Sequence, residues 1–233
     1  MLALILSCLL IGGTQLSNIS ANDGDDFVIA EEKGEGDENK DSLSDGENQD
    51  GEEITGSCGK NAAWTYKDGV LLIDGSGEMS SEILSGSSIP WADEAESVTK
   101  LIISDEITKI GGFSNLTSLE KVVFGKNVKT VSKRAFYGCS LLLSCDLSDK
   151  ITTLESEAFY GCESLISVTI PASLSEIGDK AFLGCSSLNS VMIPESVKSI
   201  GSYAFGYSKA SESGKKDGFI ITGYSDSAAS KYA

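Results

Sequence analysis

The sequence predicts an α/β repeat fold, a solenoid of parallel stacked short strands with about five rungs of 21–23 residues and a cap at each end. A five-letter phrase recurs along the chain, as AFYGC at 135–139 and 158–162, AFLGC from 181 and AFGYS from 204. The copies lie 23 residues apart. A fixed period in this range is typical of proteins in which each unit buries its apolar face only against its neighbours.

Apolar residues occupy the same phase of every repeat. Phenylalanine recurs at 113, 136, 159, 182 and 205, and an earlier rung begins at Val98 with two residues missing before the first phenylalanine. Other apolar columns keep the same spacing: Leu119, Leu142, Leu165, Leu188; Val122, Cys145, Val168, Val191; Phe124, Leu147, Ile170, Ile193; Val128, Ile151, Leu174, Val197; and Val131, Leu154, Ile177, Ile200. Equivalent side chains are therefore expected to meet in one shared core.

Each rung divides into a strand and a turn. The segment 165–171, LISVTIP, alternates like a short strand with one buried face, and its proline ends the strand by removing a backbone donor. The chain is then expected to bend at Gly178. Ala181 and Phe182 are expected to point inward from a helical turn or 3₁₀ stretch.

Residues 1–21 form a signal-peptide-like segment. The first thirteen, MLALILSCLLIGG, are an apolar run shorter than the roughly 20 residues of a membrane span but typical of a secretory segment, although no Lys or Arg precedes it. Lipidation at Cys8 is disfavoured because apolar residues follow it. We expect a secreted or cell-surface protein with no membrane span in the mature chain.

Residues 22–57 are expected to form an acidic disordered linker. They hold fourteen acidic residues against two lysines, which accounts for most of the formal net charge of −17. Such a segment has almost nothing to bury and repels itself, so it extends. We interpret it as a solvated spacer.

The ends of a solenoid expose apolar edges that caps must cover. An N-terminal β cap is expected at 58–97, leucine-rich repeats at 98–210 and a C-terminal cap at 211–233. The first cap is expected to contain a hairpin around KDG at 67–69. The covering residues are expected to be Trp64, Val70, Leu72 and Ile73 over the first rung, and Ile220, Ile221 and Tyr224 over the last.

Three cysteines end the repeated phrase, in a column whose first member is Leu116. A column that accepts leucine favours buried free thiols. These are Cys139, Cys162 and Cys185. Cys145 is expected to be buried too, because it stands in a valine column. Disulfide bonding is the alternative for these cysteines if the protein is exported. Cys58 has no partner by phase, and whether it pairs is left open.

The composition argues against an enzyme, a metalloprotein and a nucleic-acid-binding protein. The chain has no histidine, which removes the commonest general base and metal ligand. A cysteine nucleophile lacks an imidazole partner, and neither GFSNL nor GYSKA completes a G-x-S-x-G motif. Arg134 is the only arginine, so a basic footprint is absent. No catalytic residue, metal ligand or cofactor is predicted.

A binding surface is expected on the exposed face of the stacked strands. The outward positions carry small polar side chains and two apolar ones, without an aromatic anchor of the kind that dominates interfaces. The same pattern also fits a solvated sheet face that binds nothing. The candidate binding residues are Lys121, Val123, Asp146, Thr169 and Met192.

The phrase L-x-x-V-x-I-P-x-S-V-x-x-I-G-x-x-A-F-x-G-C, seen at 165–185 and 188–208, resembles the BspA-like leucine-rich repeat family of bacterial and protozoan surface proteins. The resemblance covers about residues 58–233 and extends to the segments that flank the repeats in secreted members from gut Firmicutes. It implies a leucine-rich-repeat solenoid. The asparagine ladder after the strand is not kept, since the column is Asn127, Lys150, Ser173 and Ser196.

The sequence therefore predicts a non-catalytic extracellular interaction module. The resemblance implies adhesion to a protein or glycan ligand on a host, on the extracellular matrix or on another microbe. The alternative is a structural spacer or envelope component without a dedicated ligand. We expect a monomer that binds no nucleic acid.

Overall fold

The computed structural model describes residues 52–208 and 211–233. The signal-peptide-like segment 1–21 and the expected linker as far as residue 51 lie outside the described residues.

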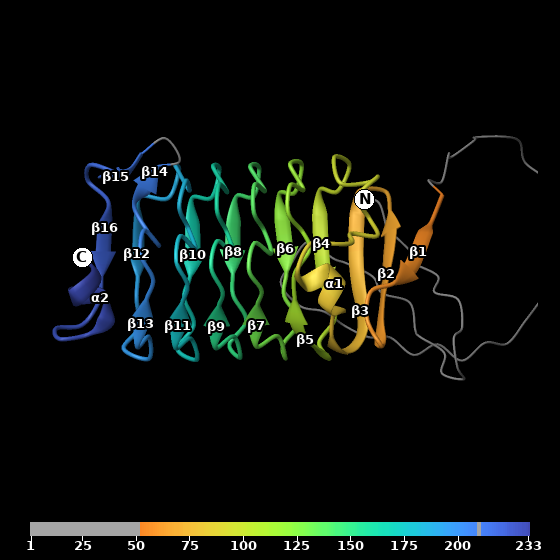
Figure 1. Ribbon diagram of the computed structural model, residues 1–233, viewed down its shortest axis with the longest axis horizontal. Helices are drawn as coiled ribbons and strands as arrows, with labels where there is room; N and C mark the ends of the chain where they lie inside the picture. The colour runs from red at the N-terminus through yellow and green to blue at the C-terminus, as the bar shows by residue number, and fades with distance from the viewer. Residues whose placement is uncertain (1–51, 209–210) are drawn as a thin grey trace, which may run out of the picture. The chain divides into compact units, whose positions relative to one another are not determined.

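The repeats form two rows of short parallel strands that follow one another along the stack (Figure 1). Equivalent residues of successive rungs are direct partners, as at Val131↔Leu154 and Ile177↔Ile200. One row contains β4 (Lys100–Ile103), β6 (Lys121–Val123), β8 (Ser144–Asp146), β10 (Ser167–Thr169), β12 (Ser190–Met192) and β16 (Ile220–Thr222). The other contains β5 (Ile107–Ile110), β7 (Thr130–Val131), β9 (Thr153–Leu154), β11 (Glu176–Ile177) and β13 (Ser199–Ile200). The predicted solenoid is confirmed. The second row of strands was not predicted from the sequence.

Phenylalanine rings form a continuous ladder through the core. Phe113, Phe136, Phe159, Phe182 and Phe205 are all at most 1% exposed. Successive centroids lie 5.4, 5.0, 5.2 and 4.8 Å apart, with interplanar angles of 25° or less. The spacing is close to the distance between neighbouring strands, so the backbone repeat places each ring in offset-stacking range. The predicted shared core is therefore confirmed.

The N-terminal cap is a meander of β1 (Ile54–Ser57), β2 (Asn61–Lys67) and β3 (Val70–Glu78), followed by the short α1 (Ser81–Leu84). The expected boundary between linker and cap at 57/58 is wrong, because β1 pairs with β2 and the cap therefore includes residues 54–57. The predicted hairpin at KDG is confirmed, with Asp68 and Gly69 both at positive φ, as a type I′ turn requires. β3 pairs in parallel with both β4 and β5. Trp91 stacks on Phe113 at 5.4 Å and meets Trp64 edge-on, so the cap extends the ring ladder.

The turn that follows each second-row strand is held alternately within its rung and to the next rung. Phe136 donates its N–H to the carbonyl of Ala158 one rung on, at 2.7 Å. Tyr137 donates its N–H to the carbonyl of Arg134 in its own rung, at 3.1 Å. This alternation satisfies the turn without helical i→i−4 bonds.

Ala181 and Phe182 point inward as expected, at 0% and 1% exposed. The expected helical or 3₁₀ stretch does not form, because the i→i−3 bonds of Leu183 and Cys185 alternate with bonds to the next rung and the residues lie in consecutive turns. The expected bend at Gly178 also needs another reason, since its φ is not positive. A Cβ on Gly178 would lie 2.5 Å from the backbone nitrogen of Ser156. Glycine stands there because adjacent rungs approach too closely for a side chain.

The C-terminal cap contains β14 (Tyr207–Ser208), β15 (Ser211–Lys215), β16 and α2 (Ala228–Tyr232). Two of its three expected covering residues are wrong, because Ile220 and Tyr224 are each 60% exposed. β16 pairs in parallel with β12, so Ile220 points outward while Ile221 packs against the core. Tyr232 covers the last ring instead, edge-on to Phe205 at 6.3 Å. Its hydroxyl accepts the Phe205 N–H at 2.8 Å.

The cysteine column forms a ladder of thiol hydrogen bonds. The Sγ atoms of Cys139, Cys162 and Cys185 donate to the carbonyls of three ladder phenylalanines, one rung back, at 3.2–3.3 Å. The expectation of buried free thiols is confirmed for these three and for Cys145. Cys58 is also buried and free, which answers the question that the sequence left open. Burial raises the pKa of Cys139 to about 12.

A thiol-reactive probe is expected to leave Cys139, Cys162 and Cys185 unmodified under native conditions, because each is buried and its Sγ is hydrogen-bonded to a backbone carbonyl. All three are expected to react in denaturant. Peptide mapping by mass spectrometry separates them from Cys8, which lies outside the described residues. Rapid native labelling of all three would contradict the ladder.

Candidate functional site

The predicted strand-face residues all lie exposed on one row of strands. Lys121 and Val123 are on β6, while the others lie on β8, β10 and β12. Asp146 and Thr169 are direct partners, and the Thr169 hydroxyl lies 3.1 Å from the Asp146 carboxylate. Met192 is 70% exposed and Val123 is 36% exposed. The face is mainly polar and has no ring, so binding there remains a prediction.

A second surface lies along the turns that carry the repeated phrase. We call it the turn edge and define it as Arg134, Tyr137, Glu157 and Tyr160. The Arg134 Nε donates to the Glu157 carboxylate at 2.6 Å, and its Cζ lies 5.4 Å from the centre of the Tyr137 ring. The rings of Tyr137 and Tyr160 stack at 4.7 Å and 5°. An arginine held between a carboxylate and an aromatic ring is already ordered before a partner arrives.

The backbone of the turns repeats an unusual conformation. Arg134, Glu157, Lys180 and Tyr203 occupy one column, and all have φ between 55° and 60°. This left-handed conformation costs a non-glycine residue about 1–2 kcal/mol. Each of the first three donates its N–H to the next rung, at 2.8–3.1 Å, which offsets part of that cost.

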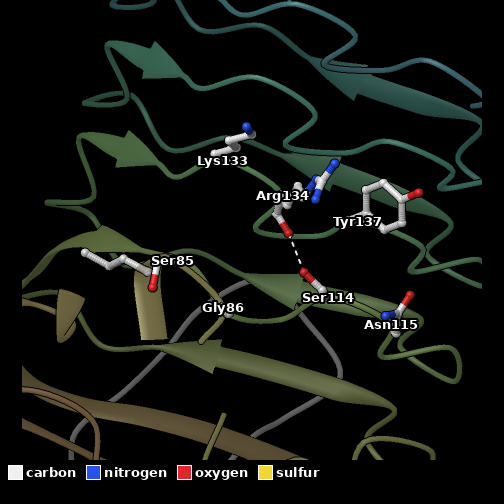
Figure 2. Close-up of a pocket in the computed structure, with 9 residues that line it drawn as sticks. Ser85, Gly86, Ser114, Asn115, Lys133, Arg134 and Tyr137 are labelled. Carbon is white, nitrogen blue, oxygen red and sulfur yellow. Dashed lines mark hydrogen bonds between the residues drawn. The ribbon is translucent and has the colours of Figure 1, made fainter. Parts of the chain in front are cut away.

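A pocket of about 330 Å³ opens beside the turn edge, between the end of α1 and the first full repeats (Figure 2). In Figure 2, Lys133, Arg134 and Tyr137 lie on one side, with Ser114 and Asn115 opposite. Both charged lining residues are cations. The lining is Leu84, Ser85, Gly86, Gly112, Ser114, Asn115, Lys133, Arg134 and Tyr137.

The hollow exists because one ring is missing from the turn edge. Ser114 is the residue equivalent to Tyr137 and Tyr160, as the backbone bonds show: the Asn115 N–H binds the Tyr137 carbonyl, and the Gly138 N–H binds the Tyr160 carbonyl. The Ser114 hydroxyl donates to the Arg134 carbonyl at 2.7 Å. The tyrosine stack thus stops one rung short of the cap, where the pocket opens.

The pocket has unused polar groups. Among the described residues, no acidic side chain pairs with the Lys133 ammonium, because the nearby Glu155 carboxylate accepts the Lys133 backbone N–H and binds Lys109 at 3.1 Å. The Asn115 side-chain amide likewise has no partner within the described ranges. Across 52–208 and 211–233, no three His, Cys, Asp or Glu side chains lie close enough to hold a metal ion.

The model of the BspA type leucine rich repeat region matches residues 93–212 in six copies. The chain belongs to this family. Leucine-rich repeats of this kind build protein-interaction modules, because a stack of repeats presents an extended surface. No curated protein matches the sequence.

Solved structures of bacterial leucine-rich repeat proteins are similar to this BspA-type chain. A T. pallidum leucine-rich repeat protein is 19% identical and covers 67% of this chain and 79% of its own, with a TM-score of 0.51. One from Eubacterium ventriosum ATCC 27560 is 16% identical, with coverage of 76% and 73% and a TM-score of 0.31. A leucine rich cell surface protein from Faecalibacterium prausnitzii A2-165 is 22% identical, with coverage of 72% and 54% and a TM-score of 0.43. At 19% identity the T. pallidum protein shows the fold alone.

Sequence reasoning missed the turn edge of this BspA-type chain. The signal was present, because the only arginine precedes the tyrosine of the first AFYGC by three residues, and that tyrosine recurs one repeat later. The phrase was interpreted as packing alone. In it, Phe136 points into the core while the next residue, Tyr137, is half-buried at the surface.

None of the helices in the described parts of the BspA-type chain has the length and apolar character needed to cross a bilayer.

Proposed function

We propose that this protein is a non-catalytic extracellular interaction module that adheres to a protein or glycan ligand on a host, on the extracellular matrix or on another microbe. Membership of the BspA-type family supports an interaction role. The apolar run at the N-terminus supports a secreted or cell-surface location.

The observation that carries the proposal is the turn edge. Arginine and tyrosine are the residue types that most often dominate binding energy at protein surfaces. Here the only arginine of the chain stands over Tyr137, which stacks on Tyr160, next to a pocket. The rings are fixed by the stack, so binding costs little side-chain entropy.

A structural spacer without a ligand is the second candidate. It is favoured by the strand face, where the outward residues of β8 and β10 are Ser144, Asp146, Ser167 and Thr169. These side chains are small and polar, and the Asp146–Thr169 contact uses two of them. Such a face suits solvent as well as it suits a partner.

The two candidates separate in a binding screen of the full chain against matrix proteins, mucins and glycans at physiological salt. For a partner that binds, Arg134→Gln is expected to weaken affinity at least tenfold, because it removes a preordered cation. The melting temperature is expected to change little, since exposed ion pairs contribute about 0–1 kcal/mol.

The matched control is Lys198→Gln, which removes a cation from the last rung and is expected to bind like the unaltered protein. Loss of binding in Lys121→Gln together with full binding in Arg134→Gln would assign the function to the strand face. Absence of binding to every partner class would favour the spacer and overturn adhesion.

A further inference from the structure

The pocket beside the turn edge lies where the tyrosine column ends. Tyr160 covers one face of Tyr137 at 4.7 Å, and the preceding rung offers Ser114 where a further tyrosine would complete the stack. A volume of about 330 Å³ lies near the lower end of the range for small-molecule sites, roughly 300–1,000 Å³. The space suits a single ring rather than an extended chain.

The charge of the pocket favours an anionic substituent on that ring. Arg134 is neutralised by Glu157, whereas Lys133 has no acidic side-chain partner among the described residues. The lining contains no Asp or Glu. A lysine ammonium at the rim therefore offers a carboxylate its charge-assisted hydrogen bond.

The remaining lining selects a sugar over a phosphate or an aromatic side chain. A phosphate site uses free backbone N–H groups, but those of Gly86 and Asn115 are already bonded to carbonyls. An aromatic side chain prefers apolar walls, whereas Ser85, Ser114 and Asn115 present hydroxyl and amide groups. A sugar ring carries hydroxyl groups and has one apolar face. The apolar face can pack on the Tyr137 ring while the hydroxyls bind the surrounding polar groups.

We propose that this pocket binds one carboxylated pyranose, the terminal unit of an acidic glycan, with the sugar ring between Ser114 and Tyr137 and its carboxylate at Lys133. The inference rests on the proposed adhesive function and names the ligand class for its site. Sialic acids and uronic acids share this chemistry, and the two arms of the test distinguish them.

The test measures binding of the full chain to the methyl glycosides of N-acetylneuraminic acid and glucuronic acid by ligand-observed NMR, with uncharged methyl galactoside as reference. At least one acidic probe is expected to bind saturably and at least fivefold more tightly than the galactoside. Lys133→Gln is expected to abolish that preference, whereas Lys198→Gln keeps it.

A second variant tests the shape. Ser114→Tyr supplies the missing ring, and Ser114 lies outside the positive-φ positions, so the stack is expected to extend without strain. We expect its melting temperature to match that of the unaltered chain while affinity for the acidic probe falls at least tenfold. Because Lys133→Gln leaves the core untouched, it decides the charge claim even if Ser114→Tyr misfolds.

Equal binding of the acidic and neutral probes, or unaltered binding in Lys133→Gln, would overturn this inference. Binding of a matrix protein that depends on Arg134, without binding of either acidic sugar, would overturn the ligand class and leave the proposed function standing. Absence of binding to every probe and partner would overturn both.

Discussion

Replacement of Phe159 by alanine is expected to lower the free energy of unfolding by about 3–5 kcal/mol. Phe159 is fully buried and stacks on Phe136 at 5.0 Å and on Phe182 at 5.2 Å. Its removal leaves a cavity in the middle of the ladder, and the rungs on both sides are fixed by backbone hydrogen bonds, so they cannot close the gap.

Urea unfolding followed by circular dichroism measures the effect. Because stability in a repeat stack comes from nearest-neighbour contacts, the transition is also expected to broaden as the two halves uncouple. The matched control is Ile166→Ala, an apolar truncation at a side chain that is 63% exposed, with an expected change within about 0.5 kcal/mol. Similar losses in both variants would contradict a core organised around the rings.

The columns of the sequence predicted the core because burial repeats with the backbone. In a stack, a position that faces inward in one rung faces inward in all, so the phenylalanine and leucine columns identify the interior without any long-range information. The same logic assigned Cys145, which is 1% exposed. It also identified the first row of strands, where Val168 and its neighbours alternate over three residues or more.

The second row of strands could not be predicted from the sequence, for a physical reason. Its members in the full repeats are two residues long, as in β9 and β11, and two residues cannot show an alternating pattern. Their pairing depends on the rungs already being stacked. The turns were misjudged similarly, since hydrogen bonds such as that of Phe182 to Ala204 join residues of different rungs and leave no local helical signal.

The ends of the stack were only partly predictable. At the N-terminal end the hairpin turn has its own local signal in Asp68 and Gly69. At the C-terminal end, by contrast, apolar character suggested covering residues, but register decides which side faces inward. Ile220 lies outside because Ile221 takes the inward position against Val191. A shift of the strand register by one residue exchanges the inward and outward side chains, and a three-residue strand is too short for the sequence to show which register forms.

The pocket at the candidate site could be found only from the structure, because it lies where the repeat is interrupted. Tyr137 and Tyr160 are visible as a column, but the pocket arises where that column reads Ser114 and where α1 of the cap comes alongside. The phenylalanine column already places Ser114 in the phase of Tyr137, and the bonds of Asn115 and Gly138 to the next rung confirm it. The approach of α1 to this position could not be read from the sequence, because it depends on how the cap packs on the first rungs.

The stability of the protein is expected to fall steeply above pH 9, because its core contains thiols that stay protonated. Burial raises the pKa of Cys139 from 9.0 to about 12, and burial also raises the pKa of Cys145 and Cys162. In the unfolded chain these thiols ionise near pH 9, so rising pH releases protons from the unfolded state alone. The contribution is complete below pH 9 and is lost progressively between pH 9 and about 12.

Each such thiol is expected to contribute a slope of about 1.4 kcal/mol per pH unit within that window. Cys139→Ala removes the contribution of one thiol to this slope. The free energy of unfolding of the variant is therefore expected to decline less steeply between pH 9 and 10.5, whatever the difference in stability at neutral pH. Urea unfolding at half-unit pH intervals measures both slopes. Ser140→Ala, at the adjacent half-buried hydroxyl outside the core, is the matched control and keeps the full slope. Parallel slopes for Cys139→Ala and the unaltered chain would mean that this thiol ionises in the folded state, which a buried hydrogen bond to the Phe113 carbonyl does not permit.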